Sequence, residues 1–249
     1  MTIDKYFFKK AYIALMRVVK IKQDFRIMSG PLKNFLWDID TDYRYVLGNY
    51  EDKTVDLLKQ HIQKGKAFYD LGANSGFFSL VANELGMRVY AFEPIPQNVQ
   101  LFTKHLTLNN KEKEITLFPY AVCDKSRTLQ FTNDANLAAN TYTASNYTKT
   151  SNFIDVKGIS LDEFLDDNQT LLKPSLMKID VEGAELDVLI GAKDTLIKYS
   201  PTILLSTHDI HIPNISNQCI DFLQQIGYTV QPDGERQTEG WKDYIAFKN

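Results

Sequence analysis

Residues 68–78 of this chain read Phe-Tyr-Asp-Leu-Gly-Ala-Asn-Ser-Gly-Phe-Phe, and this stretch decides the fold. An apolar run, a glycine-rich turn and a second apolar run predict a buried strand, a tight turn and the start of a helix. A further apolar run ends at Glu93, which lies 23 residues after Asp70. In open α/β sheets, such a turn lets a ligand approach the backbone, and the later carboxylate binds ribose hydroxyls. The sequence therefore predicts a nucleoside-containing ligand at the carboxyl ends of two strands.

The turn differs from the dinucleotide fingerprint Gly-x-Gly-x-x-Gly, which receives a pyrophosphate. It has two glycines, Gly72 and Gly76, and Asp70 precedes them. A carboxylate there repels a pyrophosphate but suits an amine or a sulfonium, and S-adenosylmethionine carries both. We expect both Gly72 and Gly76 at the cofactor site, with Gly72 letting the backbone pass close to the ligand. Asn74 would donate to its methionine carboxylate, and Glu93 would accept from both ribose hydroxyls. A turn that binds no ligand is the less favoured alternative, because the turn and the distant carboxylate occur together.

The composition is that of an ordinary soluble globular chain of 249 residues, with 44% hydrophobic and 24% charged residues. The net charge of −3 argues against nucleic acid as a partner. Cys123 and Cys219 are far apart and lack metal-type spacing, so we expect buried thiols in a reducing compartment. We find neither an apolar run long enough to span a bilayer nor a convincing secretory signal. These features favour a cytoplasmic protein.

Residues 1–26 are basic, with seven Lys or Arg against two acidic residues, a net charge of +5, interspersed with apolar residues. Such a segment fits an amphipathic helix on an anionic membrane. It also fits a helix docked on its own acidic domain or on a second subunit of a homo-oligomer. The docked helix is favoured, because nothing else in the chain points to a membrane. We therefore expect an N-terminal helical extension over residues 1–50 and a main domain over residues 51–249.

Beyond residue 50, candidate strands and helices alternate, which predicts a mostly parallel sheet covered on both faces. A capping box, Ser160–Glu163, is expected to open a short helix. Residues 133–151, rich in Asn, Thr, Ser and Ala, fit a mobile loop over the site. Further helices are expected at about 76–85, after Pro96 and around 220–226. Further strands are expected at 115–118, 129–131, 153–159, 175–179, 202–206 and 244–247.

A second polar constellation follows the strand at 175–179, where Asp180, Glu182 and Glu185 cluster. The carboxyl ends of the strands in a doubly wound sheet open on one crevice, so these carboxylates should face Gly72 and the ligand. They could orient hydroxyls, bind a divalent cation or act as general bases. His208, at the end of the next strand, is a candidate proton acceptor. The alternatives are that Glu185 is a first-turn helix carboxylate favoured by the helix dipole and that His208 is a hydrogen-bonded structural histidine.

Residues 28–249 resemble the FkbM-type family of S-adenosylmethionine-dependent methyltransferases. The resemblance implies a class I, Rossmann-like, doubly wound sheet of seven mostly parallel strands. It also implies that Tyr50 and Glu51 lie near the cofactor and that Asp180 lines the reaction site. The family typically methylates hydroxyl groups, often on sugars or natural products. The resemblance is carried by Asp70–Phe77 with Ala91–Pro94, by Lys178–Glu185, by Ser29–Leu32 with Leu47–Glu51, and by Ser160–Asp162.

We therefore expect methyl transfer from S-adenosylmethionine to a hydroxyl oxygen of a small molecule or glycan. Removal of the hydroxyl proton requires a base, either His208 or one of Asp180 and Glu182, with a divalent cation on these two carboxylates as a further option. Many members carry a glutamate where this chain has Ser206, which leaves the base and the acceptor geometry open. Other hypotheses are an N- or carboxylate-directed methyltransferase, a nicotinamide-dependent dehydrogenase and a non-catalytic nucleoside-binding module. The acidic turn argues against the dehydrogenase.

Overall fold

The computed structural model describes residues 24–38, 41–132 and 153–248. Its main sheet has seven strands, as the sequence predicts, in the order β11-β12-β10-β9-β3-β4-β5. β12 runs antiparallel to both of its neighbours, and the other pairs are parallel. The strands are β3 (Ala67–Leu71), β4 (Arg88–Phe92), β5 (Ile115–Phe118), β9 (Pro174–Ile179), β10 (Thr202–Thr207), β11 (Thr229–Gln237) and β12 (Lys242–Phe247).

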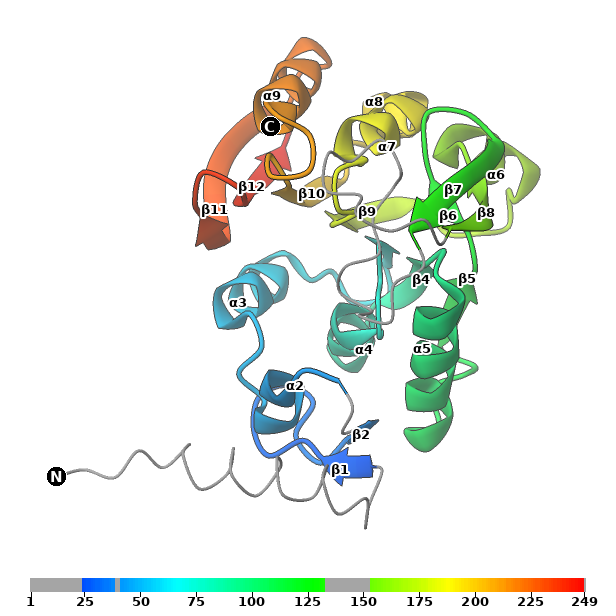
Figure 1. The fold of residues 1–249 in the computed structure, drawn as a ribbon, viewed down its shortest axis with the longest axis vertical. Coiled ribbons are helices and arrows are strands. Elements are labelled where there is room, and N and C mark those ends of the chain that lie inside the picture. The colour runs from blue at the N-terminus through cyan, green and yellow to red at the C-terminus, as the bar shows by residue number, and fades with distance from the viewer. Residues whose placement is uncertain (1–23, 39–40, 133–152, 249) are drawn as a thin grey trace, which may run out of the picture.

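Helices cover both faces of this sheet, with α3, α4 and α5 on one side and α6 to α9 on the other (Figure 1). All five residues of β3 are buried, as expected for a central parallel strand. Phe68 packs in the core beneath α3–α5, whereas Tyr69 and Leu71 pack beneath α6–α9, because side chains alternate across a strand. The helices are α3 (Asp52–His61), α4 (Phe77–Glu84), α5 (Pro96–Leu108), α6 (Leu161–Asp167), α7 (Glu185–Gly191), α8 (Lys193–Tyr199) and α9 (Ile215–Gln225).

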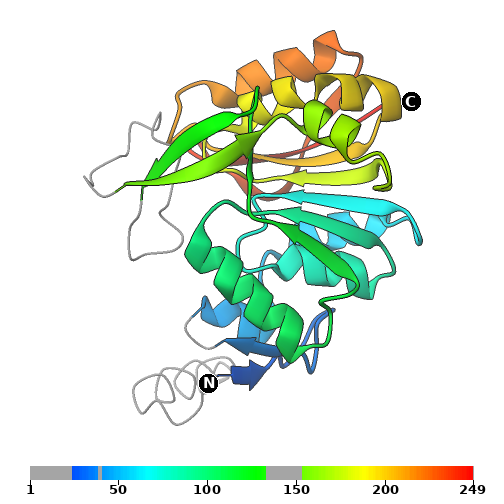
Figure 2. The ribbon, with the colours of Figure 1, turned by 90° about the vertical axis from the view of Figure 1, so that its right-hand side faces the viewer.

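A smaller sheet, β6-β8-β7, adds to this core. Its strands are β6 (Ala121–Val122), β7 (Arg127–Thr132) and β8 (Phe153–Ile159), and Figure 2 shows β7 and β8 reaching beyond the edge of the main sheet. The strands expected at 129–131 and 153–159 are confirmed. The loop expected at 133–151 lies outside the described residues. The short helix expected after Ser160 is confirmed as α6, but the Ser160 hydroxyl donates to the Gly191 carbonyl and accepts no hydrogen bond from an α6 amide, so the expected capping box is wrong.

The N-terminal extension is not wholly helical, because its described residues, 24–38 and 41–50, form a two-stranded hairpin and one short helix. These elements are β1 (Asp24–Arg26), β2 (Leu36–Asp38) and α2 (Tyr43–Leu47). Trp37 is fully buried and stacks on His105 of α5 at 3.7 Å between ring centroids. The extension thus shares the core of the main domain, although its first 23 residues, including most of the basic segment, lie outside the described ranges.

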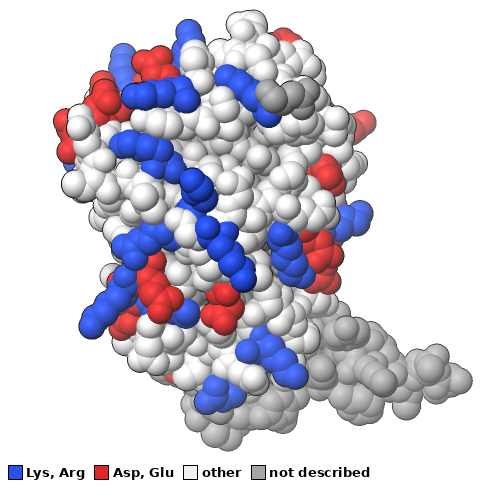
Figure 3. Space-filling view, turned by 180° about the vertical axis from the view of Figure 1, so that it is seen from behind, with Lys and Arg blue, Asp and Glu red and all other residues white. Residues whose placement is uncertain are grey.

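Charged side chains of both signs occupy the surface. On the face shown in Figure 3, acidic side chains lie beside many of the Lys and Arg side chains. Within the described residues, no helix has the length and apolar character needed to cross a membrane.

Candidate active site

A pocket opens at the carboxyl ends of β3, β4 and β9, where the strand order reverses direction. This is the ligand-binding position in open α/β sheets. The pocket has a volume of about 1170 Å³ when its solvent-open part is included. We call Asp70, Gly72, Asn74 and Glu93 the β3–β4 wall, and Lys178, Asp180, Glu182 and Arg236 the β9–β11 wall. The other lining residues used below are Tyr45, Tyr50, Phe78, Tyr120 and Asp187.

Glu93 is 3% exposed and is bonded into the backbone around it. Its Oε2 accepts from the Asn74 amide at 2.8 Å, and its Oε1 accepts from the Ile95 amide at 2.9 Å and from Asn98 Nδ2 at 3.2 Å. Burial raises the pKa of Glu93 to about 7, although these hydrogen bonds favour its charged form. A carboxylate has about four acceptor positions, so about one is left for a ribose hydroxyl, where the sequence suggested two.

Asp70, also in the β3–β4 wall, keeps one carboxylate oxygen available. Its Oδ2 accepts from the Ser79 hydroxyl at 2.6 Å, whereas its buried Oδ1 has no hydrogen-bond partner among the described residues. Burial raises the pKa of Asp70, and the charge of Lys178 opposes this rise. A buried carboxylate oxygen without a partner is costly, and an amine donor from a ligand would satisfy it. This feature fits the amino group of S-adenosylmethionine.

The two glycines of the turn serve internal packing. Gly72 has φ +83°, and a Cβ there would lie 1.9 Å from the Asp180 carbonyl oxygen. The glycine is therefore required for contact between the turn and the end of β9, and because Gly72 also lines the pocket, its expected close approach to the ligand stays a prediction. Gly76 has φ +88° and faces the ring of Phe102 on α5. It does not line the pocket, so its predicted role at the cofactor is indirect.

Tyr50 and Glu51, which the family resemblance implicated, have different positions. Tyr50 lines the pocket and packs against Tyr45 with 4.1 Å between ring centroids. Burial raises the pKa of Tyr50 well above its usual value. Glu51 lies outside the pocket lining, and its Oε1 is 4.0 Å from Arg236. Burial raises the pKa of Glu51, and the charge of Arg236 opposes this rise.

Asp180 stands at the centre of a dense ionic group on the β9–β11 wall. Its Oδ2 accepts from Lys178 Nζ at 2.8 Å and from Arg236 Nη2 at 3.4 Å. Burial by itself raises the pKa of Asp180, but the charges of Lys178, Arg236 and His208 together hold it well below its usual range. Asp180 is therefore ionised and weakly basic at neutral pH. This property argues against Asp180 as the general base and favours a positioning role.

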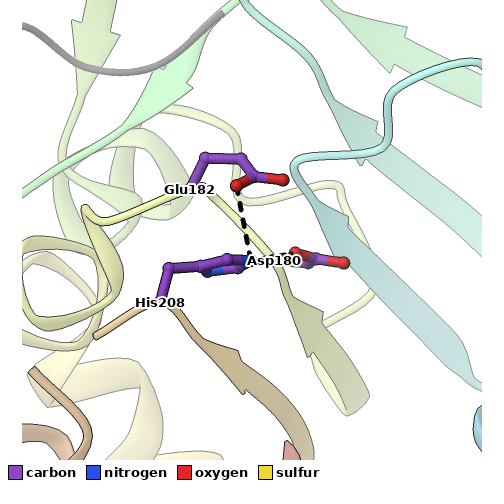
Figure 4. A group of neighbouring side chains, drawn as sticks. All are labelled: Asp180, Glu182 and His208. Atoms are coloured by element: carbon purple, nitrogen blue, oxygen red, sulfur yellow. Dashed lines mark ion pairs between the residues drawn. The ribbon is translucent and has the colours of Figure 1, made fainter. Parts of the chain in front are cut away.

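His208 lies behind this wall, fully buried, and does not line the pocket. Its Nδ1 is 2.7 Å from Glu185 Oε1, and its Nε2 is 3.4 Å from both Asp180 Oδ1 and Glu182 Oε2 (Figure 4). Burial lowers the pKa of His208, but Glu182, Glu185 and Asp180 outweigh burial and raise it to about 9. His208 therefore carries a proton at neutral pH, which argues against it as the proton acceptor.

Glu182 remains the most accessible of the three predicted catalytic residues. Its side chain is 36% exposed and lines the pocket, and its Oε2 is 3.0 Å from His211 Nε2. Its backbone has φ +54°, a left-handed conformation that few non-glycine residues adopt and that recurs at functional sites. The sequence thus brought Asp180, Glu182, Glu185 and His208 together correctly, as one connected cluster.

Sequence reasoning missed two cations of this site. Lys178 is 3% exposed, and its Nζ lies 4.8 Å from the centre of the Phe78 ring. Its position two residues before Asp180 on a strand could have placed both on one face. Arg236 comes from β11, and its Nη2 also donates to the hydroxyl of Ser206. No sequence signal connects Arg236 to Asp180, since their contact depends on the sheet order.

A match to a known family model identifies the protein family to which this site belongs. The profile of the methyltransferase FkbM domain matches residues 70–230, which is more than half of the chain and contains both walls apart from Arg236. The chain belongs to the FkbM methyltransferase family. The methyl donor of this family is S-adenosylmethionine, and the unpartnered oxygen of Asp70 and the remaining acceptor position of Glu93 fit its amine and ribose.

Individual relatives agree with this assignment. The chain is 29% identical over 148 residues to hexuronic acid methyltransferase AglP of Haloferax volcanii. The aligned region covers 59% of this chain and 58% of that protein. It is also 23% identical over 200 residues to methyltransferase 1 of Beauveria bassiana. That aligned region covers 73% of this chain and 78% of the relative. The crystal structure of methyltransferase FkbM from Methylobacillus flagellatus superposes with a TM-score of 0.51 at 18% identity, covering 74% of this chain and 43% of that one. This likeness confirms the fold.

Proposed function

We propose that this methyltransferase acts on a hydroxyl oxygen of a sugar or of a sugar-containing natural product. The observation that carries the proposal is the β9–β11 wall, where Asp180 and Glu182 present carboxylates to the pocket. Carboxylates that accept hydrogen bonds from neighbouring hydroxyls suit a polyol. Aromatic side chains in the same lining, including Tyr50 and Tyr120, offer flat surfaces to a sugar ring. The hexuronic acid named for the Haloferax relative is a substrate of this class.

The β3–β4 wall would hold the cofactor. Asp70 Oδ1 would accept from the amine, Glu93 from a ribose hydroxyl, and Asn74 would donate to the methionine carboxylate. When bound, the cofactor supplies a methyl carbon made electrophilic by its sulfonium. The protein's contribution is to hold the acceptor oxygen in line with that carbon and to exclude competing water.

In this proposal Glu182 accepts the proton of the acceptor hydroxyl. It reaches the pocket with more exposed surface than Asp180, whose basicity Lys178 and Arg236 reduce. Asp180 would accept a hydrogen bond from a neighbouring hydroxyl and fix the ring orientation. His208, which lies on the side of Glu182 away from the pocket, would fix the position of the Glu182 carboxylate.

A second candidate is methylation of a carboxylate, because a hexuronic acid offers both a carboxylate and hydroxyls. A carboxylate acceptor needs no base, but it would have to approach Asp180 and Glu182 against like charge. The cations beside them are already matched, since Lys178 pairs with Asp180 and Arg236 lies between Asp180, Glu51 and Asp243. The wall therefore favours a neutral hydroxyl.

The test is the chemistry of the product. Purified protein would be incubated with S-adenosylmethionine carrying a labelled methyl group and with a panel of glucuronides and their uronate-reduced counterparts. We expect label in a product that survives mild alkali, because a methyl ether is stable there and a methyl ester is not. The reduced counterparts should also be accepted. Label that alkali releases, together with inactive reduced counterparts, would replace this proposal with carboxylate methylation.

A further inference from the structure

We propose that the chain binds one divalent transition-metal ion through Asp180 Oδ1, Glu182 Oε2 and His208 Nε2, with Glu185 positioning the histidine. These three ligand atoms lie within 4.8 Å of one another, and Nε2 is 3.4 Å from each of the two oxygens. Ligands that each lie about 2.1 Å from one ion stand roughly 3.0–3.4 Å apart in octahedral or tetrahedral geometry. The spacing therefore suits an ion after small side-chain movements.

The imidazole of His208 is the observation that separates this cluster from an ordinary acidic patch. The side chain is fully buried, and its Nε2 has no hydrogen-bond partner among the described residues, although it points toward both carboxylates. Its other nitrogen, Nδ1, is 2.7 Å from Glu185 Oε1, which also accepts from the Gly183 amide at 2.9 Å. A carboxylate behind a histidine in this way fixes the ring and directs the opposite nitrogen at a metal. The ion would displace the proton that Nε2 carries in the metal-free chain and release it to solvent.

The two carboxylates are arranged to share an ion with this nitrogen. The two carboxylate oxygens of Asp180 have different neighbours. Oδ2 contacts Lys178 and Arg236, whereas Oδ1 faces His208. Glu182 itself has a left-handed backbone conformation, and Gly183 after it has φ +108°. His211 Nε2 lies 3.0 Å from the same Glu182 oxygen, so this contact would loosen or be shared when the ion binds.

The ligand set indicates the class of ion. One imidazole nitrogen with two carboxylate oxygens suits Mn²⁺, Fe²⁺, Co²⁺ or Zn²⁺, whereas Mg²⁺ and Ca²⁺ prefer oxygen alone. Three protein ligands also leave coordination positions for other groups. Because Asp180 and Glu182 line the pocket, these positions face the acceptor space. This role rests on the proposed function: Glu182 would hold the ion through Oε2, the ion would make a bound acceptor hydroxyl more acidic, and Glu182 Oε1 would accept the proton.

The experiment measures the metal alone, without cofactor or acceptor, so its result does not depend on the proposed function. Chelator-treated full-length protein would be titrated with Mn²⁺, and the free ion would be followed by its electron paramagnetic resonance signal. We expect one saturable site per chain. Zn²⁺ should displace the bound Mn²⁺, and a hundredfold excess of Mg²⁺ should not.

Variants then locate the site. His208→Gln and Glu182→Gln should each weaken Mn²⁺ binding at least tenfold, and Glu185→Gln, which acts through the histidine, by about 10–100-fold. Asp187→Asn, a pocket carboxylate outside the cluster, and His61→Gln, a histidine on α3, should bind as the unaltered chain does. Circular dichroism checks that each variant is folded. Glu182→Gln is the variant expected to disturb folding least, because the Glu182 side chain is partly exposed. Absence of a saturable site, or equal binding by folded Glu182→Gln and the unaltered chain, would overturn the inference.

Discussion

The two walls of the pocket are built on different physical principles. In the β3–β4 wall, buried carboxylates are satisfied mainly by backbone amides and a hydroxyl, with no cation in hydrogen-bonding contact with Asp70 or Glu93 among the described residues. In the β9–β11 wall, Asp180 is bonded to the cations Lys178 and Arg236, and the charged ring of His208 lies 3.4 Å away. The first arrangement leaves carboxylates poised to accept hydrogen bonds from a ligand. The second balances several charges against one another, so that its members act as a unit.

The largest expected effect falls on the contact that joins the walls. Gly72→Ala would push a Cβ into the Asp180 carbonyl at a positive φ, and we expect a loss of about 4 kcal/mol or more in the free energy of unfolding. Gly65→Ala is the matched control, since it has φ +77° and no atom within 4 Å of its Cβ position. It should lose about 1–2 kcal/mol, the cost of the backbone conformation alone. Urea denaturation of both variants makes the comparison, and equal losses would refute the packing role of Gly72.

The charge balance of the β9–β11 wall predicts the next effect. Lys178→Met keeps the apolar length of the side chain but leaves Asp180 with Arg236 at 3.4 Å, so we expect a loss of about 2–4 kcal/mol in stability. Lys104→Met, which breaks two partly exposed ion pairs with Asp24 and Asp38, should lose about 1 kcal/mol or less. Both losses in the free energy of unfolding would be measured from the midpoints of denaturant unfolding curves. A Lys178→Met protein as stable as the Lys104→Met protein would mean that the wall does not depend on this cation.

The smallest effect tests the β3–β4 wall through pH. Burial raises the pKa of Glu93 to about 7, and a ribose hydroxyl donor favours the ionised form. Cofactor affinity should therefore be full above pH 7 and fall, by up to about tenfold per unit, as the pH drops below 7. Glu93→Gln should show weak binding with a smaller pH slope. Calorimetry with S-adenosylhomocysteine between pH 5.5 and 8.5 measures this, and an affinity that rises toward low pH would contradict it.

The difference between the walls also explains how far the sequence could be read. Asp70, Gly72 and Asn74 lie within five residues of one another, and Glu93 ends the neighbouring strand, so local pattern and topology were enough to group them. Asp180, Glu182 and His208 were found because they follow parallel strands. Arg236 was missed because it reaches the site through the register of β11 on β12, which is irregular between Pro232 and Gln237.

Charge states were the second part that sequence could not give. His208 was expected to accept a proton near neutral pH, yet its three carboxylate neighbours raise its pKa to about 9. Those neighbours were known, but their distances and burial were not, and these set the sign of the shift. The N-terminal hairpin was missed for a different reason. β1 and β2 have three residues each, too few to show a period, and what fixes them is the stack of Trp37 on His105.

The central claim is that the β3–β4 wall binds the cofactor and the β9–β11 wall acts on the acceptor. Calorimetry with S-adenosylhomocysteine and turnover measurements on Glu93→Ala and Glu182→Gln test it most directly. We predict that Glu93→Ala weakens cofactor binding by roughly 1–3 kcal/mol. Glu182→Gln should bind the cofactor within about twofold of the unaltered chain and lose roughly 10²–10⁴-fold in turnover. Unchanged cofactor affinity in Glu93→Ala, or a Glu182→Gln protein that binds poorly and turns over normally once saturated, would contradict the division of the pocket.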